Sequence, residues 1–222
     1  MLVCAKIETR ILIFTRNSSR EYYTEGSFNN PLADLNINTN DRDNLALLYL
    51  NIHSISYKLD RFSNFFGSVA LKFSVIGISE TWLDDSSHSC EILGFNFIHN
   101  HEVGRTGGGV GLYLADYLEF KHRADLVFSK DCAESLFVEI NRTKGKNIVI
   151  GVIYRPPDCK LRHFILELAR LVSVISEENK TVFLMSDWNL NLMNYCCHQA
   201  TGEFLDLINV FQNVFSFDYP PY

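Results

Sequence analysis

Residues 181–189 have the sequence TVFLMSDWN, and this stretch decides how the fold is interpreted. Residues 181–185 are mostly apolar, and the polar residues Ser186 and Asp187 follow them directly. A short apolar run of this kind predicts a buried strand. The polar residues that follow it then lie at the edge of a sheet, where α/β proteins gather their functional groups.

The same pattern occurs three more times. The runs are Leu45–Leu50 ending at Asn51, Phe73–Ile78 ending at Ser79 and Glu80, and Ile148–Ile153 ending at Tyr154 and Arg155. Two further strands are expected at Gly109–Leu114 and Ser135–Ile140, and amphipathic helices at Lys58–Phe66, Phe164–Ile175 and Gly202–Phe211. Strands with interspersed helices, and no glycine-rich nucleotide fingerprint, predict a layered α/β sandwich and not a Rossmann fold.

The first 44 residues differ from the rest of the chain. The run Asn29–Asp41 is polar, asparagine-rich and without periodicity, which is typical of a linker. The shorter segment before it shows no pattern that assigns secondary structure. We therefore expect an N-terminal extension and linker over residues 1–44, poorly ordered, and one domain over residues 45–222.

Composition limits the classes of function. With 20 Lys and Arg against 26 Asp and Glu, the net charge is −6, which disfavours a simple electrostatic nucleic-acid binder. It leaves open an enzyme whose acidic residues hold a cation. The apolar stretch Ile11–Phe14 is too short to span a membrane. The six cysteines include no C-x-x-C pair, so we expect reduced thiols in an intracellular protein, nuclear or cytoplasmic.

The end of the 181–189 stretch can bring two polar side chains together. In an extended chain, side chains two residues apart share a face, so Asp187 and Asn189 project together while Trp188 points back into the core. A carboxylate beside an amide suits holding a water molecule and a phosphoryl oxygen. The alternative is that Asp187 and Asn189 form only a local turn at the strand end.

The other strand ends add complementary groups. Glu80 supplies a second carboxylate and Asn51 an amide oxygen, and such hard oxygen ligands suit Mg²⁺ or Mn²⁺. The phenol of Tyr154 can donate a hydrogen bond to an oxyanion on phosphorus. Each residue also has an ordinary structural explanation. Glu80 and Asn51 can cap turns, and Tyr154 can be a half-buried tyrosine of the sheet. The glycines at 107–109 lack the Lys-Ser/Thr of a phosphate loop, so a tight entry into the next strand is favoured.

Five segments in this order carry a resemblance to a known family. They are LNIHS (50–54), SETWL (79–83), GRTGGGV (104–110), YRPP (154–157) and SDWN (186–189). From about residue 45 onward the chain resembles the endonuclease domain of non-LTR retrotransposons, which is similar to apurinic/apyrimidinic endonucleases and deoxyribonuclease I. This endonuclease/exonuclease/phosphatase family has a four-layer α/β sandwich with two packed mixed β-sheets flanked by helices.

The resemblance implies catalytic roles at the matching positions. Glu80 corresponds to the principal metal ligand, with Asn51 beside it. Tyr154 would stabilise the transition state. Asp187 would orient or deprotonate the attacking water, and Asn189 would take part in catalysis by gripping the scissile phosphate.

The resemblance also implies the substrate and cofactor. Arg105 and Arg155 would bind DNA, the cofactor would be Mg²⁺ or Mn²⁺, and the protein would act as a monomer away from membranes. The expected function is a metal-dependent phosphodiesterase or DNA endonuclease that hydrolyses a phosphodiester by in-line attack of water.

Two departures from the family keep alternatives open. The Ser-Asp-His segment near the family's C-terminus does not occur in this sequence, so the domain is expected to lack its last strands. The reverse transcriptase portion of a complete retroelement is also absent from this chain. One alternative is an enzyme of the same fold that acts on another phosphoester, and a second is a catalytically inactive remnant.

Overall fold

The chain is described here by a computed structural model. The described residues are 2–6, 10–14, 20–23, 45–68, 72–84, 90–100, 107–129, 131–178, 180–190 and 199–215, with side chains between 45 and 208.

The first sheet has seven strands in the described part of the chain, in the order β3-β2-β1-β4-β5-β7-β6. Their bounds are β1 Leu2–Lys6, β2 Arg10–Phe14, β3 Arg20–Tyr23, β4 Leu47–Asn51, β5 Val75–Ser79, β6 Phe95–Asn100 and β7 Val110–Ala115. Strands β1, β4 and β5 run parallel, and the other neighbours pair antiparallel. The sheet is therefore mixed, as the sequence predicts.

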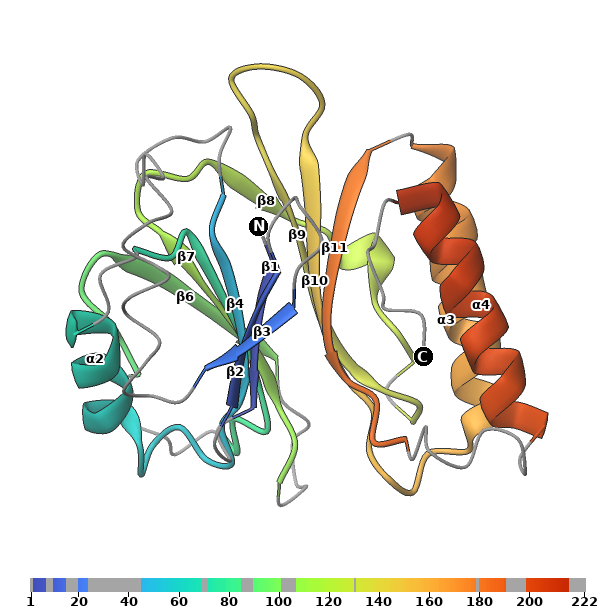
Figure 1. Cartoon of the computed structure of the whole chain (residues 1–222), viewed down its shortest axis with the longest axis horizontal. Coiled ribbons are helices and arrows are strands. Elements are labelled where there is room, and N and C mark those ends of the chain that lie inside the picture. The colour runs from blue at the N-terminus through green and yellow to red at the C-terminus, as the bar shows by residue number, and fades with distance from the viewer. Residues whose placement is uncertain are drawn as a thin grey trace.

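The second sheet has the strand order β11-β10-β9-β8 among the described residues. Its strands are β8 Phe120–His122, β9 Glu134–Ile140, β10 Ile148–Tyr154 and β11 Thr181–Asp187. The helices are α2 Leu59–Ser68, η1 Ala124–Leu126, α3 Leu161–Glu177 and α4 Gln199–Phe215. The two sheets pack face to face, with α2 outside the first and α3 and α4 outside the second (Figure 1). This is the expected four-layer α/β sandwich.

Successive side chains of a strand point to opposite faces of its sheet, so each strand contributes to two cores: one between the sheets and one under the helices. On β4, Leu48 and Leu50 pack toward α2, whereas Leu47 and Tyr49 pack between the sheets. Strand β10 alternates in the same way, with even-numbered residues between the sheets and odd-numbered ones toward α3. The inward row of β4 therefore ends at Asn51, and that of β10 at Tyr154. Polar residues at these ends share one edge of the space between the sheets.

Helix α3 covers the outer face of the second sheet with one apolar stripe. Its buried residues recur at helical spacing, and they are Phe164, Leu168, Leu171, Val172 and Ile175. Burying a side chain of this size contributes about 1.5–3 kcal/mol. The stripe predicted at Phe164–Ile175 is therefore the surface that attaches this layer.

A partly buried cluster of charges joins the second sheet to α3. This charge cluster consists of Arg123, Asp125, Glu139, Glu178 and Lys180. Arg123 donates to Asp125 at 2.6 and 2.8 Å and to Glu139 and Glu178 at 3.0 Å, and Lys180 donates to Glu139 at 2.9 Å. Only 1% of Glu139 is exposed. Because charges cost energy to bury unless they are paired, the cluster can persist only with its partners in place.

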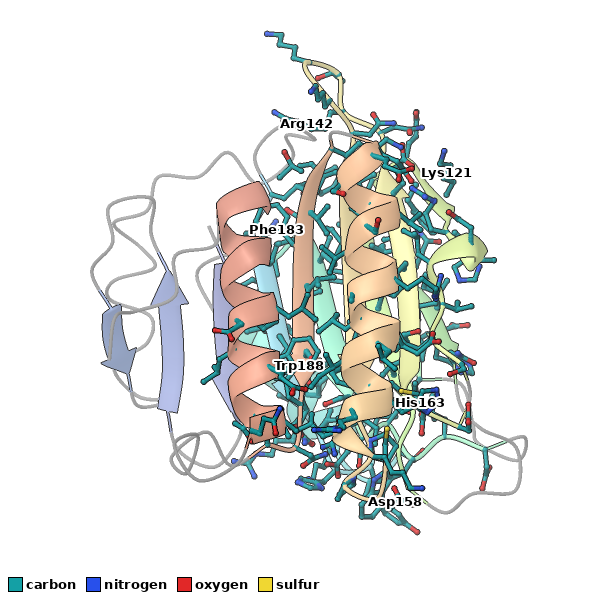
Figure 2. All side chains as sticks on the ribbon, turned by 90° about the vertical axis from the view of Figure 1, so that its right-hand side faces the viewer. Lys121, Arg142, Asp158, His163, Phe183 and Trp188 are labelled. Carbon is teal, nitrogen blue, oxygen red and sulfur yellow. The ribbon has the colours of Figure 1, made fainter. Side chains whose placement is uncertain are left out.

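The charge cluster and the end of β10 that carries Tyr154 lie apart. Lys121, which contacts Glu139, lies at the same end of the molecule as Arg142 in the β9–β10 loop, and Asp158 lies at the opposite end (Figure 2). Strand β10 runs from this loop toward the end that carries Tyr154.

The six strands and three helices predicted from residue 45 onward all occur, with ends shifted by a few residues. Strands β6 and β8 were not predicted, because β6 is a half-exposed edge strand and β8 has three residues. The structure also places β1–β3 in the segment to which the sequence assigned no secondary structure. The expected linker 29–41 lies outside the described residues. No helix in the described part is long and apolar enough to cross a membrane.

Candidate active site

The candidate site begins where β4 and β5 end. Pairing between the two segments continues past the strands: Ile52 N–H donates to Ser79 O at 3.0 Å, and Ser54 N–H donates to Glu80 O at 2.8 Å. A further bond of 3.0 Å joins Ile55 N–H to Thr81 O. Two loops are thereby joined side by side, and Glu80 is fixed next to Asn51.

Backbone strain is concentrated in these loops. Within the described chain, the non-glycine residues with positive φ are His53 (45°), Ser54 (72°), Glu80 (54°), Trp82 (52°) and Asn189 (47°). Such conformations cost an L-residue roughly 1–2 kcal/mol each. They persist only where surrounding contacts fix them, and they cluster at functional sites. The strain therefore points to the edge that the sequence predicts.

An asparagine amide joins the two sheets at this edge. Asn51 Nδ2 donates to Glu80 Oε1 at 2.9 Å and to Asp187 Oδ2 at 2.6 Å. Asn51 ends β4 in the first sheet, and Asp187 ends β11 in the second. The other oxygen of Glu80, Oε2, contacts His53 Nδ1. Three of the predicted site residues are thus in direct contact, and the two carboxylates share one donor.

The second sheet presents a row of three site side chains. Tyr154 is paired in register with Asp187 on one side and with Glu134 on the other, so all three face the first sheet. Tyr154 and Glu134 are buried. Sequence reasoning missed Glu134, although the signal was available. It precedes the alternating strand at 135–140 and shares the inward parity of Leu136.

The glycine loop closes the site from the side of β7. Gly109 N–H donates to Glu134 Oε2. A Cβ at Gly108 would lie 2.3 Å from Glu134 Oε1, and one at Gly109 would lie 2.1 Å from Thr81 Oγ1, so only glycine fits against these groups. Both glycines have positive φ, at 78° and 86°, and lead into Val110. The tight strand entry predicted for glycines 107–109 is confirmed.

Trp188 points away from the site, as predicted. Its ring lies 5.6 Å from that of Phe164 and 5.5 Å from that of Phe204, centroid to centroid, between α3 and α4 (Figure 2). The exposed Asn189 then turns back: its N–H donates to Asp187 Oδ1 at 3.1 Å, and its Nδ2 donates to Arg155 O at 2.8 Å. Asp187 and Asn189 therefore form the local turn that was the alternative explanation. Asp187 also contacts Asn51, so the turn does not exclude a site at this position.

Arg155 has a different place from the one that the resemblance predicts. It is 4% exposed and donates to Trp188 O at 3.0 Å, to Asn189 O at 3.1 Å and to Cys159 O at 2.5 Å. The residue after Tyr154 points to the opposite face of the sheet, toward α3. Arg155 therefore fixes the loop that carries Asn189, and the substrate-binding role expected for it stays a prediction. Arg105 lies outside the described residues.

The site has the composition that a magnesium ion needs. Asn51 Oδ1 is buried and has no hydrogen-bond partner in the described structure, so this oxygen is available to a cation. The carboxylates of Glu80 and Asp187 lie on either side of the same amide. No group of three His, Cys, Asp or Glu side chains converges within the described residues. Mg²⁺ does not require one, because it is commonly held by one or two carboxylates, waters and substrate phosphates.

Comparison with known proteins identifies similar folds among solved structures. No protein-family model matches the sequence, and no curated protein matches it. Among solved structures, the endonuclease domain of TRAS1, a telomere-specific non-LTR retrotransposon, is similar with a TM-score of 0.53 and 13% identity, covering 74% of this chain and 69% of that one. The apurinic/apyrimidinic endonuclease LMAP from Leishmania major has a TM-score of 0.52 and 11% identity, with coverage of 79% and 71%. The chain therefore has the fold of the endonuclease/exonuclease/phosphatase proteins.

Proposed function

We propose that this chain is a divalent-metal-dependent phosphodiesterase, a retrotransposon-derived endonuclease domain that hydrolyses a DNA phosphodiester by in-line attack of water. One observation carries the proposal. The Asn51 amide joins Glu80 of one sheet to Asp187 of the other, at strand ends that adjoin residues held at positive φ. Two carboxylates that share a single donor are not required to stabilise the edge of a sheet, whereas groups of ionisable side chains are common at functional sites.

The metal would be held by Glu80 and by the free oxygen of Asn51. When bound, Mg²⁺ would supply positive charge that neutralises the phosphate oxygens and favours ionisation of a water molecule. Hard carboxylate and amide oxygens suit this ion or Mn²⁺.

The remaining site residues would act on water and phosphate. Each oxygen of Asp187 accepts one hydrogen bond, from Asn51 or from Asn189, and a carboxylate oxygen can accept a second. Asp187 can therefore orient a water molecule and take its proton. Tyr154, beside it on the same face, would donate to the phosphoryl oxygen that gains charge. Asn189 uses one of its two amide hydrogens on Arg155 O, and the other would bind the scissile phosphate.

Nicking of supercoiled plasmid with Mg²⁺ tests the proposal. We expect Asp187→Ala to lower the nicking rate by about 100-fold or more, since a general base contributes on the order of 10²–10⁴. The matched control is Asp116→Ala, an exposed carboxylate beyond the far end of β7, which should nick like the parent chain.

No Ser-Asp-His segment occurs in this sequence, and adding one would supply a further electrostatic donor to the transition state. Losing one electrostatic donor to the transition state costs about 10²–10³ in rate. A version of the chain extended by that segment from a related element should therefore nick faster than the chain itself. Equal nicking by the extended protein and by its Asp187→Ala variant would refute the proposal.

A further inference from the structure

Trp82 is a large apolar side chain held outward at the rim of the site. Its side chain is 47% exposed, although it lies only two residues after the buried Glu80. Its φ of 52° is left-handed, which is a rare conformation for a bulky residue. Hydrogen bonds from Trp82 N–H to Gly108 O at 2.9 Å and from Thr81 N–H to Gly109 O at 3.3 Å hold this backbone in place. The fold thus stabilises an outward-facing indole at an energetic cost.

The indole is connected to the reaction centre through one neighbour. The rings of Trp82 and His53 lie edge to face, with centroids 6.0 Å apart and planes at 84°. His53, itself half exposed, contacts Glu80. On its other side the indole adjoins the glycine loop, since a Cβ at Gly107 would lie 3.8 Å from Trp82 Nε1. A group stacked on Trp82 would therefore lie within about one nucleotide of a phosphate bound at Glu80.

The chemistry of the rim favours a nucleobase as the group that Trp82 contacts. The chain has a net charge of −6, so attraction to phosphates contributes less to binding than in a basic nuclease. Stacking on an aromatic ring contributes about 1–3 kcal/mol per base and needs no positive charge. A phosphoester without an aromatic ring, such as an inositol phosphate, would gain nothing from an exposed indole.

We propose that Trp82 stacks on an unpaired base next to the scissile phosphate and so selects single-stranded or locally opened DNA. The inference rests on the proposed function, because it takes the phosphate to be bound at Glu80. A base within an intact duplex is already stacked on its neighbours, so Trp82 can engage it only after it leaves the stack.

The test compares two oligonucleotides of equal length and charge. One is a fluorescent thymidine 12-mer, and the other has the same backbone without bases. Binding is measured by anisotropy with Ca²⁺ replacing Mg²⁺, so that turnover does not interfere. We expect the protein to bind the thymidine strand about 5- to 150-fold more tightly, the range that corresponds to one stacked base. Trp82→Ala should abolish the difference, whereas Trp82→Phe should keep most of it. Leu93→Ala, at a fully exposed residue (101%), is the matched control and should keep all of it.

Fluorescence provides a second measurement. The chain has two tryptophans, and Trp188 is packed between phenyl rings, so quenching by the thymidine strand should come mainly from Trp82 and should disappear in Trp82→Phe. Equal binding of the two strands by the parent protein, or a preference that survives Trp82→Ala, would overturn the inference. The proposed function is tested separately by nicking. If nicking survives Asp187→Ala, the proposed function fails, independently of the binding results.

Discussion

Replacing Glu139 with Gln should cost the folded protein about 3 kcal/mol at neutral pH. Burial raises the pKa of Glu139, but hydrogen bonds from Asn147, Lys180 and Lys121 outweigh it and lower the pKa from 4.5 to about 2. A shift of this size corresponds to about 3 kcal/mol of preference for the charged form in the folded state. Removing one partner from a buried ion pair costs about 3–5 kcal/mol, and Arg123 and Lys180 keep Glu178 as a partner, which favours the lower end.

The sign of the pH dependence follows from the direction of the shift. Because the pKa of Glu139 is depressed in the folded state, its contribution is fully present above about pH 4.5 and is lost as the pH falls toward 2. It should be about 1 kcal/mol at pH 3 and smaller again at pH 2. The difference in stability between the parent protein and Glu139→Gln should therefore shrink on acidification.

Urea unfolding at pH 7 and pH 3 measures this difference. With a slope of about 2 kcal/mol per molar urea, the midpoint at pH 7 should fall by about 1.5 M in Glu139→Gln. Glu91→Gln, at an exposed glutamate, is the matched control and should shift the midpoint little. Equal midpoints for the two variants at pH 7, or a difference that does not shrink by pH 3, would refute the reasoning.

Two further predictions concern the site and the N-terminal segment. Asn51→Ala removes the donor that Glu80 and Asp187 share, so nicking with Mg²⁺ should fall about 10- to 100-fold. More Mg²⁺ should also be needed for half-maximal rate, and an unchanged Mg²⁺ dependence would argue against Asn51 as a ligand. Deleting residues 1–44 should leave one cooperative thermal transition, since the polar, asparagine-rich run 29–41 has little apolar surface to bury, but should increase light scattering because it exposes an edge of β4. Loss of the cooperative transition would show that the extension belongs to the core.

The fold from residue 45 onward could be predicted from the sequence because its strands are short apolar runs. Buried strands such as 148–153 carry an unambiguous hydrophobic signal. The edge strand β6, with the sequence FNFIHN, is half exposed and carries a weak one. Strands β1–β3 are short, and their sequence carries no pattern that assigns secondary structure.

The site could be predicted in part. The end of each apolar run identified Asn51, Glu80 and Asp187, but only the packing of the two sheets brings residues 136 positions apart into contact. The orientation of Arg155 could have been anticipated, because it follows the inward Tyr154 and must point the other way. The charge cluster could not, since Arg123 and Glu139 look like surface residues until their partners are known.

The separation of the two ends of the sandwich has a consequence for changes in chain length. The side chains at the candidate site depend on strand parity, so one residue added to or removed from β4, β10 or β11 would rotate Asn51, Tyr154 or Asp187 out of the space between the sheets. The β9–β10 hairpin loop at the other end carries no such constraint, because residues 143–146 are exposed and Ile140 pairs directly with Ile148 behind them. This hairpin is the natural place to insert a fluorescent reporter, which would extend from the end of the molecule opposite the candidate site.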